Sequence, residues 1–561
     1  MNITPIYPLL LGDDTPSAPQ RLTLDPVTRI EGHLRIDTEV DQGTIRKAWS
    51  SATLFRGIEL VLKNRDPRDA PLITQRLCGV CTYVHLACAT TCIEDAWGVI
   101  PPANARIIRN LLMGAQYLHD HVVHFYHLHA LDWVDLSAAL TADVTATGLL
   151  ASQVTPYAPT IDFGAVKTRL ATFATQGQLG PFTAGYFGHP AYKLSPEANL
   201  LLVAHYLEAL KVQARAAKMM AIFGGKNPHP QSVVVGGVTC ASEMGAEGRF
   251  DTFAGLLAET ADFIDTVYLP DVAFLAGAYP EWASLGGCDN FLAYGEFPLD
   301  DAAATLLSPR GAIFNRDLAG VQDVDLSQVS EHVARSWYEG EADLHPTEGA
   351  TEPAYTGYDD QARYSWLKAP RYFGEPMEVG PLARVLVAYA SGSAPYVAAV
   401  NAFLNETGLS TEALFSVLGR TAARAIETKV IAAAMTDWLA EVRTNLNTGQ
   451  TRVFTSYTAP ATASGVGLGE APRGALGHWL RTAGGAIANY QLVVPSAWNF
   501  GPRCAADKES PVESSLKGIP VADVSQPLEV LRLVHSFDPC IACGVHLIDV
   551  RSGEEKTVKV R

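Results

Sequence analysis

Two Cys-x-x-Cys pairs near opposite ends of the chain constrain its fold more than any other feature. Cys78 and Cys81 form the first pair, and Cys540 and Cys543 form the second. A two-residue spacer lets both sulfurs of a pair reach one metal or one metal pair, and four thiolates make a soft site that suits nickel, iron or zinc. A fold that uses both pairs at one site must bring together segments 540 − 78 = 462 residues apart.

The simplest alternative is a structural zinc site with four cysteine ligands. Spacing alone supports zinc as well as it supports an active centre, because Cys-x-x-Cys pairs commonly bind zinc. Small zinc modules, however, keep both pairs within one short segment. A site that ties together the two ends of a large domain is more typical of a buried active centre.

The composition indicates a folded protein that does not bind nucleic acid. Hydrophobic residues make up 48% of the 561 residues and charged residues 18%, as in globular interiors. The net charge is 42 − 59 = −17, which disfavours DNA, RNA and anionic lipid as partners. No apolar run reaches the ~18 residues of a membrane span, and residues 1–20 lack the pattern of a secretory signal. We therefore expect any export to use a partner's signal.

Helical patterns predict an α+β fold that is mainly α, with a large helical-bundle core and small antiparallel β elements in one domain. The alternation across residues 22–40 predicts a half-buried strand. Cys78 and Cys81 are predicted at the start of a helix, where the helix dipole lowers thiol pKa. Residues 340–371 are predicted to be irregular. Long helices are predicted over residues 81–97, 104–130, 196–223, 251–275 (interrupted at Pro270) and 411–446.

Cys88 and Cys92 are further potential ligands, because they continue the helical face of Cys81 and His85. Small buried cysteines are more often core residues than ligands. We therefore predict that Cys88 and Cys92 pack in the core.

Further motifs accompany the two cysteine pairs. Together, and in this order, the motifs resemble the large subunit of nickel–iron hydrogenases, most closely the membrane-bound uptake group, over nearly the whole chain. Each motif alone is weak. They are Asp-Pro-Val-Thr-Arg-Ile-Glu-Gly-His at 25–33, Arg-Gly-Ile-Glu at 56–59, His-Asp-His at 119–121, His-Phe-Tyr at 124–126, Phe-Gly-Gly-Lys-Asn-Pro-His-Pro at 223–230, Glu-Ala-Pro-Arg-Gly at 470–474, Asn-Tyr-Gln at 489–491 and Val-Pro-Ser at 494–496.

The resemblance implies that all four cysteines bind a nickel–iron pair. It assigns Cys78 and Cys540 as terminal ligands of nickel, and Cys81 and Cys543 as bridges from nickel to iron. The iron in such enzymes also carries one CO and two cyanides. The cysteine at position 540 implies the sulfur form of the enzyme and not the selenium form.

Pro495 and Ser496 match the family positions that cradle one of these cyanides on the iron. A hydroxyl donor beside an anionic ligand is chemically reasonable.

The resemblance also implies a proton path for heterolytic cleavage of H2. The Cys540 thiolate can accept the proton, and Glu31 matches the carboxylate that removes it; burial beside thiolates should raise the pKa of Glu31. Arg473 matches the arginine over the open metal face, where it would orient H2 or act as an unusual base. Asp120 and Asp538 match the acids that hold this arginine.

Without the resemblance, these charged residues have ordinary interpretations. Arg473 with its two aspartates would be read as a salt bridge, and Glu31 as a strand residue paired with Arg29 or His33.

A second metal site is implied near the first. Glu59 and His546 match ligands of a magnesium or iron ion, and the carbonyl of Leu492 would be a third contact; carboxylate and water suit magnesium, whereas histidine is less usual. The family does not use the histidine-rich stretch for its metals, so we interpret those residues as packing and hydrogen-bonding groups. They are His119, His121, His124, His127 and His129.

The resemblance finally implies processing and partners. Residues 547–561 match an extension that an endopeptidase removes after His546, which leaves a mature domain of residues 1–546. Too few cysteines remain for an electron relay, so an iron–sulfur small subunit is required, in a heterodimer or a dimer of heterodimers. A membrane cytochrome b as acceptor and a place on the periplasmic side of the membrane, reached with the small subunit, complete the expectation of H2 uptake. Without export, the expected place is the cytoplasm.

Three alternatives remain at this point. An H2 sensor of the same fold generally lacks the cleaved extension. The quinone-reducing subunit of respiratory complex I lacks the four cysteines. A zinc-stapled structural protein would make the nearby charged residues incidental, and metal analysis separates it.

Overall fold

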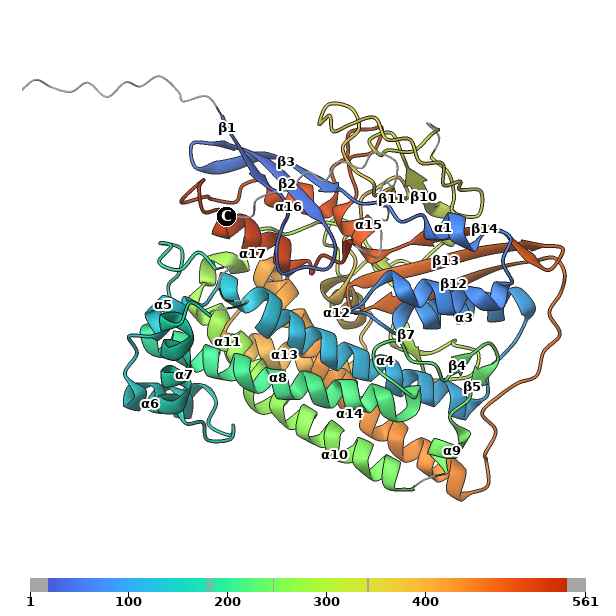
Figure 1. Cartoon of the computed structure of the whole chain (residues 1–561), viewed down its shortest axis with the longest axis horizontal. Helices are drawn as coiled ribbons and strands as arrows, with labels where there is room; N and C mark the ends of the chain where they lie inside the picture. The colour runs from blue at the N-terminus through green and yellow to red at the C-terminus, as the bar shows by residue number, and fades with distance from the viewer. Residues whose placement is uncertain are drawn as a thin grey trace, which may run out of the picture.

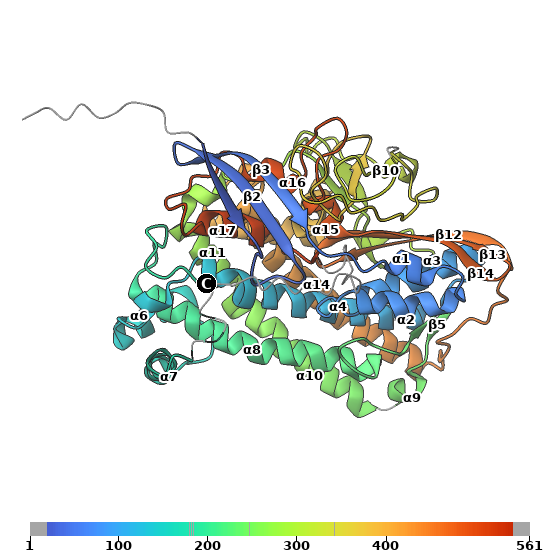
Figure 2. The same cartoon turned by 45° about the horizontal axis from the view of Figure 1, so that its top comes forward.

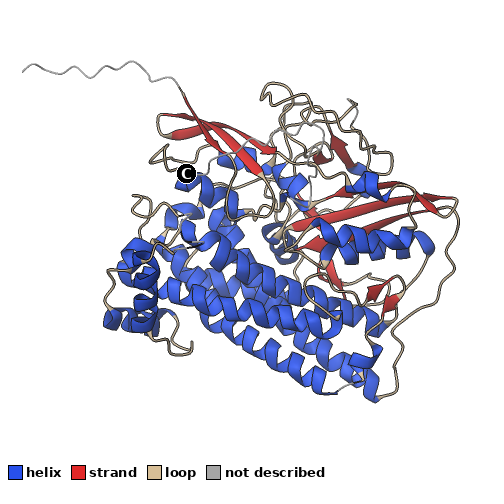
Figure 3. Ribbon diagram, viewed as in Figure 1, coloured by secondary structure: helices blue, strands red, loops and turns tan. Residues whose placement is uncertain are grey.

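Four long helices pack side by side and form the core of the molecule (Figure 1). They are α4 (Ala103–Val123), α8 (Pro196–Gly224), α10 (Glu247–Phe263) and α14 (Val417–Asn447). The computed structural model describes residues 19–178, 180, 182, 185–245, 247–340 and 343–541. The predicted mainly α fold with a helical-bundle core is confirmed, and Figure 3 shows the bundle as a layer of helices below the strands.

Local signals set the ends of these helices. The Ser195 side chain accepts a hydrogen bond from the N–H of Ala198, Pro196 opens α8, and Gly225 closes it at φ 79°, a conformation that glycine adopts without strain. The Ser416 hydroxyl likewise accepts from the N–H of Gly419 at 3.0 Å. The helix predicted over 411–446 is therefore a 3₁₀ turn, Thr411–Leu414, followed by α14.

Two predicted helices are interrupted by π-helical turns. The one predicted over 104–130 is α-helical to Val123 and π-helical over His124–His129. The one predicted over 251–275 ends as α10 at Phe263, becomes π-helical over Ile264–Tyr268 and resumes as α11 (Leu269–Ala278). Pro270 has no N–H to continue the hydrogen-bond ladder, so the predicted interruption is confirmed and begins before the proline.

An antiparallel sheet of order β1-β2-β3 forms the N-terminal part (Figure 2). Its strands are β1 (Gln20–Leu24), β2 (Leu34–Asp41) and β3 (Thr44–Ala52). The strand predicted within residues 22–40, in a small antiparallel sheet, is confirmed as β2. The same stretch also contains the end of β1 and a loop of residues 25–33 that separates β1 from β2. This loop carries Pro26, which cannot donate to a ladder, and Glu31.

A second sheet of order β12-β13-β14 carries the helix that follows the first cysteine pair. It consists of β12 (Ala463–Ala471), β13 (Gly474–Ala483) and β14 (Ala486–Val493), and α3 (Val84–Trp97) lies on it (Figure 1). Glycine permits this close packing: a Cβ atom on Gly467 would lie 2.2 Å from the carbonyl oxygen of Cys88.

Short elements complete the described chain. None of residues 343–368 lies in a helix or named strand, as predicted for this region. The short helices are α1 (Ile58–Leu62), α2 (Ala70–Thr74), α5 (Leu136–Ala139), α6 (Val144–Val154), α7 (Phe163–Thr175), α9 (Ala241–Met244), α12 (Pro381–Ala390), α13 (Ala394–Thr407), α15 (Pro495–Phe500), α16 (Pro511–Leu516) and α17 (Leu528–Ser536). The short strands are β4 (Val233–Val234), β5 (Gly237–Val238), β6 (Phe291–Ala293), β7 (Glu296–Pro298), β8 (Leu306–Ser308), β9 (Gly311–Ile313), β10 (Val329–His332) and β11 (Ala369–Tyr372).

Hydropathy and length single out no described helix that crosses a membrane by itself. The pair α12 and α13 meets both criteria only together, and a bend of 108° separates its two helices.

Candidate metal centre

Three cysteine sulfurs converge in the interior. The Sγ atoms of Cys78, Cys81 and Cys540 all lie within 4.8 Å of one another, and all three residues are buried. The Sγ atoms of Cys78 and Cys540 are 3.2 Å apart. Cys543, the fourth predicted ligand, lies outside the described residues. A compact, buried set of thiols is a soft donor set, so the described residues fit nickel or iron and would equally suit zinc.

Backbone N–H groups around the first cysteine pair point at the Cys78 sulfur. The N–H groups of Val80 and Cys81 both donate to the Cys78 Sγ at 3.2 Å. Because these N–H groups point at the sulfur and not at carbonyls, the segment cannot be helical, and α3 begins only at Val84. The prediction that the pair opens a helix is therefore wrong; donors from the loop, and not a helix dipole, favour the thiolate here.

Cys540, the first cysteine of the second pair, is held by the N-terminal loop. Glu31 and Cys540 form a parallel β-bridge. The N–H of Ile541 donates to the Glu31 carbonyl at 2.7 Å, and the N–H of Glu31 donates to the Pro539 carbonyl at 3.3 Å. The Ser496 hydroxyl, next to Pro495 at the start of α15, accepts from the N–H of Cys540 at 3.1 Å. The structure thus brings Glu31, Ser496 and Cys540 together.

Arg473 lies in the turn between β12 and β13 and is buried. Its guanidinium forms ion pairs with Asp120 at 3.3 Å and with Asp538 at 3.1 Å. Burial alone would lower the pKa of Arg473, but the carboxylates of Asp538 and Asp120 and the sulfurs of Cys540 and Cys81 raise the pKa well above its usual range. The predicted arginine–aspartate group therefore sits beside the thiols as a fixed cation.

A second buried arginine braces this turn, and sequence reasoning missed it. Arg384 of α12 donates to the carbonyl oxygens of Ala471 at 2.9 Å and Pro472 at 2.8 Å, directly before Arg473. It also forms ion pairs with Glu427 at 2.6 Å and Glu470 at 2.8 Å. Among these partners, only those in the 470–474 motif were singled out from the sequence. No local pattern pointed to Arg384.

The carboxyl of Glu31 is electrostatically unusual. Burial raises its pKa, and the nearby Cys78 sulfur raises it further, while Arg473 and Arg56 lower it. The predicted direction is confirmed. Arg29 is not its partner, because this guanidinium bonds the Leu128 carbonyl and Asp132.

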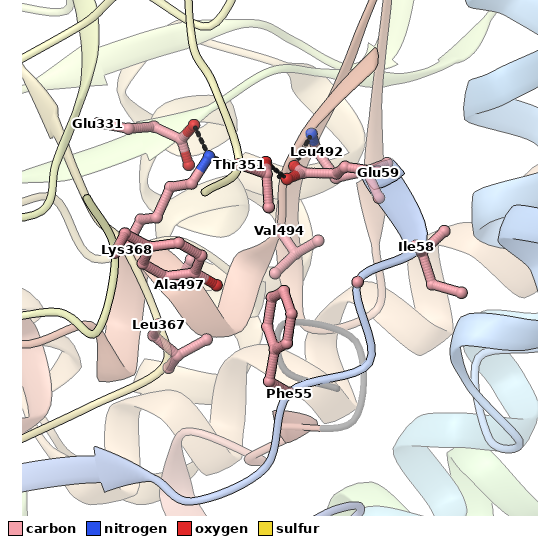
Figure 4. Close-up of a pocket in the computed structure, with 12 residues that line it drawn as sticks. Phe55, Ile58, Glu59, Glu331, Thr351, Leu367, Lys368, Leu492, Val494 and Ala497 are labelled. Atoms are coloured by element: carbon pink, nitrogen blue, oxygen red, sulfur yellow. Dashed lines mark hydrogen bonds and ion pairs between the residues drawn. The ribbon is translucent and has the colours of Figure 1, made fainter. Parts of the chain in front are cut away.

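Glu59 lines a small cavity of about 50 Å³ (Figure 4). One of its carboxylate oxygens accepts from the N–H of Leu492 at 2.9 Å, and the other accepts from the hydroxyl of Thr351. The Lys368 ammonium lies 3.8 Å from Glu59 and 3.2 Å from Glu331. His546, the other predicted ligand here, is outside the described residues. The oxygen donors fit a hard cation, although Lys368 already supplies positive charge.

The remaining candidate ligands are packing residues, as predicted. The thiols of Cys88 and Cys92 donate to the Gly467 and Gly465 carbonyls of β12. The five histidines do not share one site, because each ring bonds a different group. Their partners are Asp120 and Gln213 for His119, Glu427 for His121, and the carbonyl oxygens of His535, Tyr206 and Arg532 for His124, His127 and His129.

A buried thiol cluster faced by an arginine that two carboxylates hold, inside an α+β helical bundle, defines a metal-binding protein. Comparison with known proteins makes the class specific. Residues 56–546 match the family described as nickel-dependent hydrogenase, and residues 21–53 match one described as HoxL-like. The chain belongs to the nickel-dependent hydrogenase family and corresponds to the large subunit of these enzymes.

Similar proteins cover almost the whole chain. The quinone-reactive Ni/Fe-hydrogenase large chain of Wolinella succinogenes is 43% identical over 96% of this chain and 98% of its own. The uptake hydrogenase large subunit of Rhizobium leguminosarum is 44% identical, over 97% and 98%. The solved NiFeSe hydrogenase of Desulfovibrio vulgaris Hildenborough, in its as-isolated oxidised state, matches with a TM-score of 0.78 and 34% identity, over 94% of this chain and all of that one.

Proposed function

We propose that this chain cleaves H2 heterolytically at a nickel–iron pair held by Cys78, Cys81, Cys540 and Cys543, with one CO and two cyanides on the iron. The observation that carries the proposal is the convergence of the three described sulfurs within 4.8 Å in a buried site. When bound, the nickel–iron pair would polarise H2 and accept its electrons.

The chain's own residues would then orient H2 and move its proton. Arg473, fixed by Asp120 and Asp538, presents a cation toward the sulfurs and orients the substrate. The Cys540 Sγ takes the proton, and the Glu31 carboxylate removes it. Burial and the Cys78 sulfur raise the pKa of Glu31, which makes its carboxylate a better proton acceptor. Pro495 and Ser496 would cradle a cyanide beside the Cys540 segment.

The Glu59 cavity would hold magnesium or iron. Glu59 would ligate the ion directly, with the Leu492 carbonyl and His546 as further ligands and water filling the remaining positions. Lys368 and Glu331, joined at 3.2 Å, border the same cavity and would bind that water (Figure 4).

The electrons require a partner. An iron–sulfur small subunit would accept them, in a heterodimer or a dimer of heterodimers. Because one relative is named quinone-reactive and others are named uptake hydrogenases, we propose a membrane cytochrome b as the next acceptor and a position on the periplasmic side of the membrane. A maturation endopeptidase would cleave after His546 and remove residues 547–561.

The test is H2-dependent dye reduction by the purified heterodimer, combined with nickel and iron analysis. We expect equal amounts of nickel and iron and active enzyme. Glu31→Gln should abolish turnover and keep both metals, because the amide cannot accept the proton. Glu39→Gln, on neighbouring β2 in an ion pair with Lys47, is the matched control and should stay active. Zinc in place of nickel and iron would refute the proposal, and an active Glu31→Gln enzyme would refute the role of Glu31.

A further inference from the structure

Three distant segments of the chain meet at one buried carboxylate, Asp132. One oxygen of Asp132 accepts from the Arg29 guanidinium at 2.5 Å, and the other accepts from the His535 Nδ1 at 2.6 Å. Asp132 follows the π-helical segment His124–His129, which comes after α4. Arg29 lies in the loop after β1, and His535 lies in the last turn of α17. None of these contacts involves the thiol ligands.

The hydrogen-bond partners of His535 fix the orientation of its ring. Its Nδ1 faces the Asp132 carboxylate, and its Nε2 faces the Thr28 carbonyl oxygen at 2.9 Å. An ionised carboxylate and a carbonyl can only accept hydrogen bonds. The His535 ring therefore lies between two acceptors and links Thr28, in the loop that carries Glu31, to Asp132.

The charges around Asp132 keep its carboxyl ionised. Burial alone would raise the pKa of Asp132, but Arg29 and His535 hold it well below its usual range, so it is ionised. The neighbouring His129, whose Nε2 is 3.9 Å from Asp132, is neutral because burial lowers its pKa to about 3. The Arg532 guanidinium bonds the backbone carbonyl of Asp132 and not its carboxylate.

The residues bonded to Asp132 belong to the two chain segments that carry Glu31 and Cys540. Thr28 and Arg29 precede Glu31 in its loop, and His535 precedes Asp538 and Cys540 on the other segment. The two segments then meet again at the β-bridge of Glu31 with Cys540. Arg29 itself has a left-handed backbone at φ 56°, which is strained for a residue with a side chain, and its bonds to Asp132 and the Leu128 carbonyl hold it there.

We propose that Asp132 is a positioning residue that, through Arg29 and the His535 ring, fixes the Glu31 loop against the Cys540 segment. The proposal rests on the proposed function, in which Glu31 receives the proton from Cys540. Asp132 itself touches neither substrate nor metal; removing its charge would leave the buried Arg29 guanidinium without its ion-pair partner and let the two segments move apart.

The test compares Asp132→Asn with wild type as the assembled heterodimer. We expect the infrared bands of CO and cyanide to persist and the KM for H2 to stay nearly constant. Turnover (kcat) should fall about tenfold or more, because small displacements of reacting groups are costly, and its solvent deuterium isotope effect should rise as proton transfer becomes limiting. His127→Gln is the matched control, because His127 lies in the π-helical segment that precedes Asp132 and its ring bonds the Tyr206 carbonyl.

Each outcome decides the proposal. Wild-type kcat and isotope effect in Asp132→Asn, or an equal loss in His127→Gln, would overturn it. If Asp132→Asn fails to assemble, Arg29→Lys is the second variant, because lysine keeps the positive charge and loses the two-pronged guanidinium that bonds both Asp132 and the Leu128 carbonyl. Arg29→Lys should show the same loss of kcat, and wild-type kcat in Arg29→Lys would overturn the proposal. A wild-type enzyme without infrared bands or H2 oxidation would instead indicate failure of the proposed function.

Discussion

The Sγ atoms of Cys78 and Cys540 lie 3.2 Å apart, although 462 residues separate them in the sequence. No local element joins these segments; the β-bridge of Glu31 with Cys540 and the Ser496 hydroxyl hold the second segment in place. The thiol site is therefore a product of the whole fold, and its chemistry can be tested one ligand at a time.

Replacing Cys540 by serine should prevent nickel retention, because a hydroxyl is a poor ligand for a soft metal site. The purified variant should contain less than about a tenth of the wild-type nickel by elemental analysis. Cys88→Ser is the control: this buried thiol donates to the Gly467 carbonyl, and serine can do the same. Normal nickel content in Cys540→Ser would remove Cys540 from the ligand set.

Arg473→Lys should keep the metals and lower kcat by about a hundredfold, because lysine carries the charge without the fork that spans Asp120 and Asp538. H2-dependent dye reduction measures this loss. In Arg443→Lys, an exposed ion pair with Asp251 changes, and such pairs contribute little, so activity should be unaffected. Equal activity in both variants would contradict a role for the Arg473 guanidinium.

Gly467→Ala should destabilise the contact of α3 with β12. The new Cβ would lie 2.2 Å from the Cys88 carbonyl oxygen, and such overpacking costs about 1–3 kcal/mol or more. Thermal unfolding of the heterodimer should show a lower midpoint. Gly277→Ala in α11 meets no atom within 4 Å and should be neutral or slightly stabilising. An unchanged midpoint in Gly467→Ala would show that the helix and strand are not in this close contact.

Buried carboxyls make stability depend on pH. Burial raises the pKa of Glu296 from 4.5 to about 7, so the folded state holds a proton that the unfolded state releases. This contribution is fully present below about pH 4.5 and is lost as pH rises through about 7. Glu296→Gln should therefore flatten the fall in unfolding midpoint between about pH 5 and about pH 8, by about 3 kcal/mol in free energy.

Two other carboxyls, those of Glu470 and Glu259, serve as references in the same pH series. Glu470, whose pKa is also raised to about 7 by burial, remains in the Glu296→Gln variant, so some slope should persist. Glu259→Gln removes a carboxyl that is 59% exposed and should leave the slope unchanged. A wild-type slope in Glu296→Gln would mean that Glu296 is ionised in the folded protein.

Features with a local cause could be predicted from the sequence. Ser195 and Pro196 mark the start of α8, and Pro270 marks the broken helix, because caps and missing N–H groups act within one turn. The thiols, Arg473 and Glu31 were found through motifs whose order carries the information. The predicted start of α3 was wrong because the N–H groups of Val80 and Cys81 bond the Cys78 sulfur, a choice that no propensity records.

The residues behind the site could not be predicted. Arg384 bonds Glu427, Glu470 and the turn that carries Arg473, and Asp132 joins Arg29 to His535. These partners lie far apart in the sequence and have no fixed spacing. A charged residue within a helical sequence pattern is normally assigned to the solvent-exposed face of the helix. Only the tertiary structure reveals that such a residue is buried and paired.

The most direct test of the central claim is an infrared spectrum of the purified heterodimer, with the mass of the large subunit measured on the same sample. A nickel–iron centre on the four cysteines predicts sharp bands from one metal-bound CO and two cyanides, in a chain trimmed after His546. A trimmed chain without these bands would contradict the claim and return the cysteine pairs to zinc.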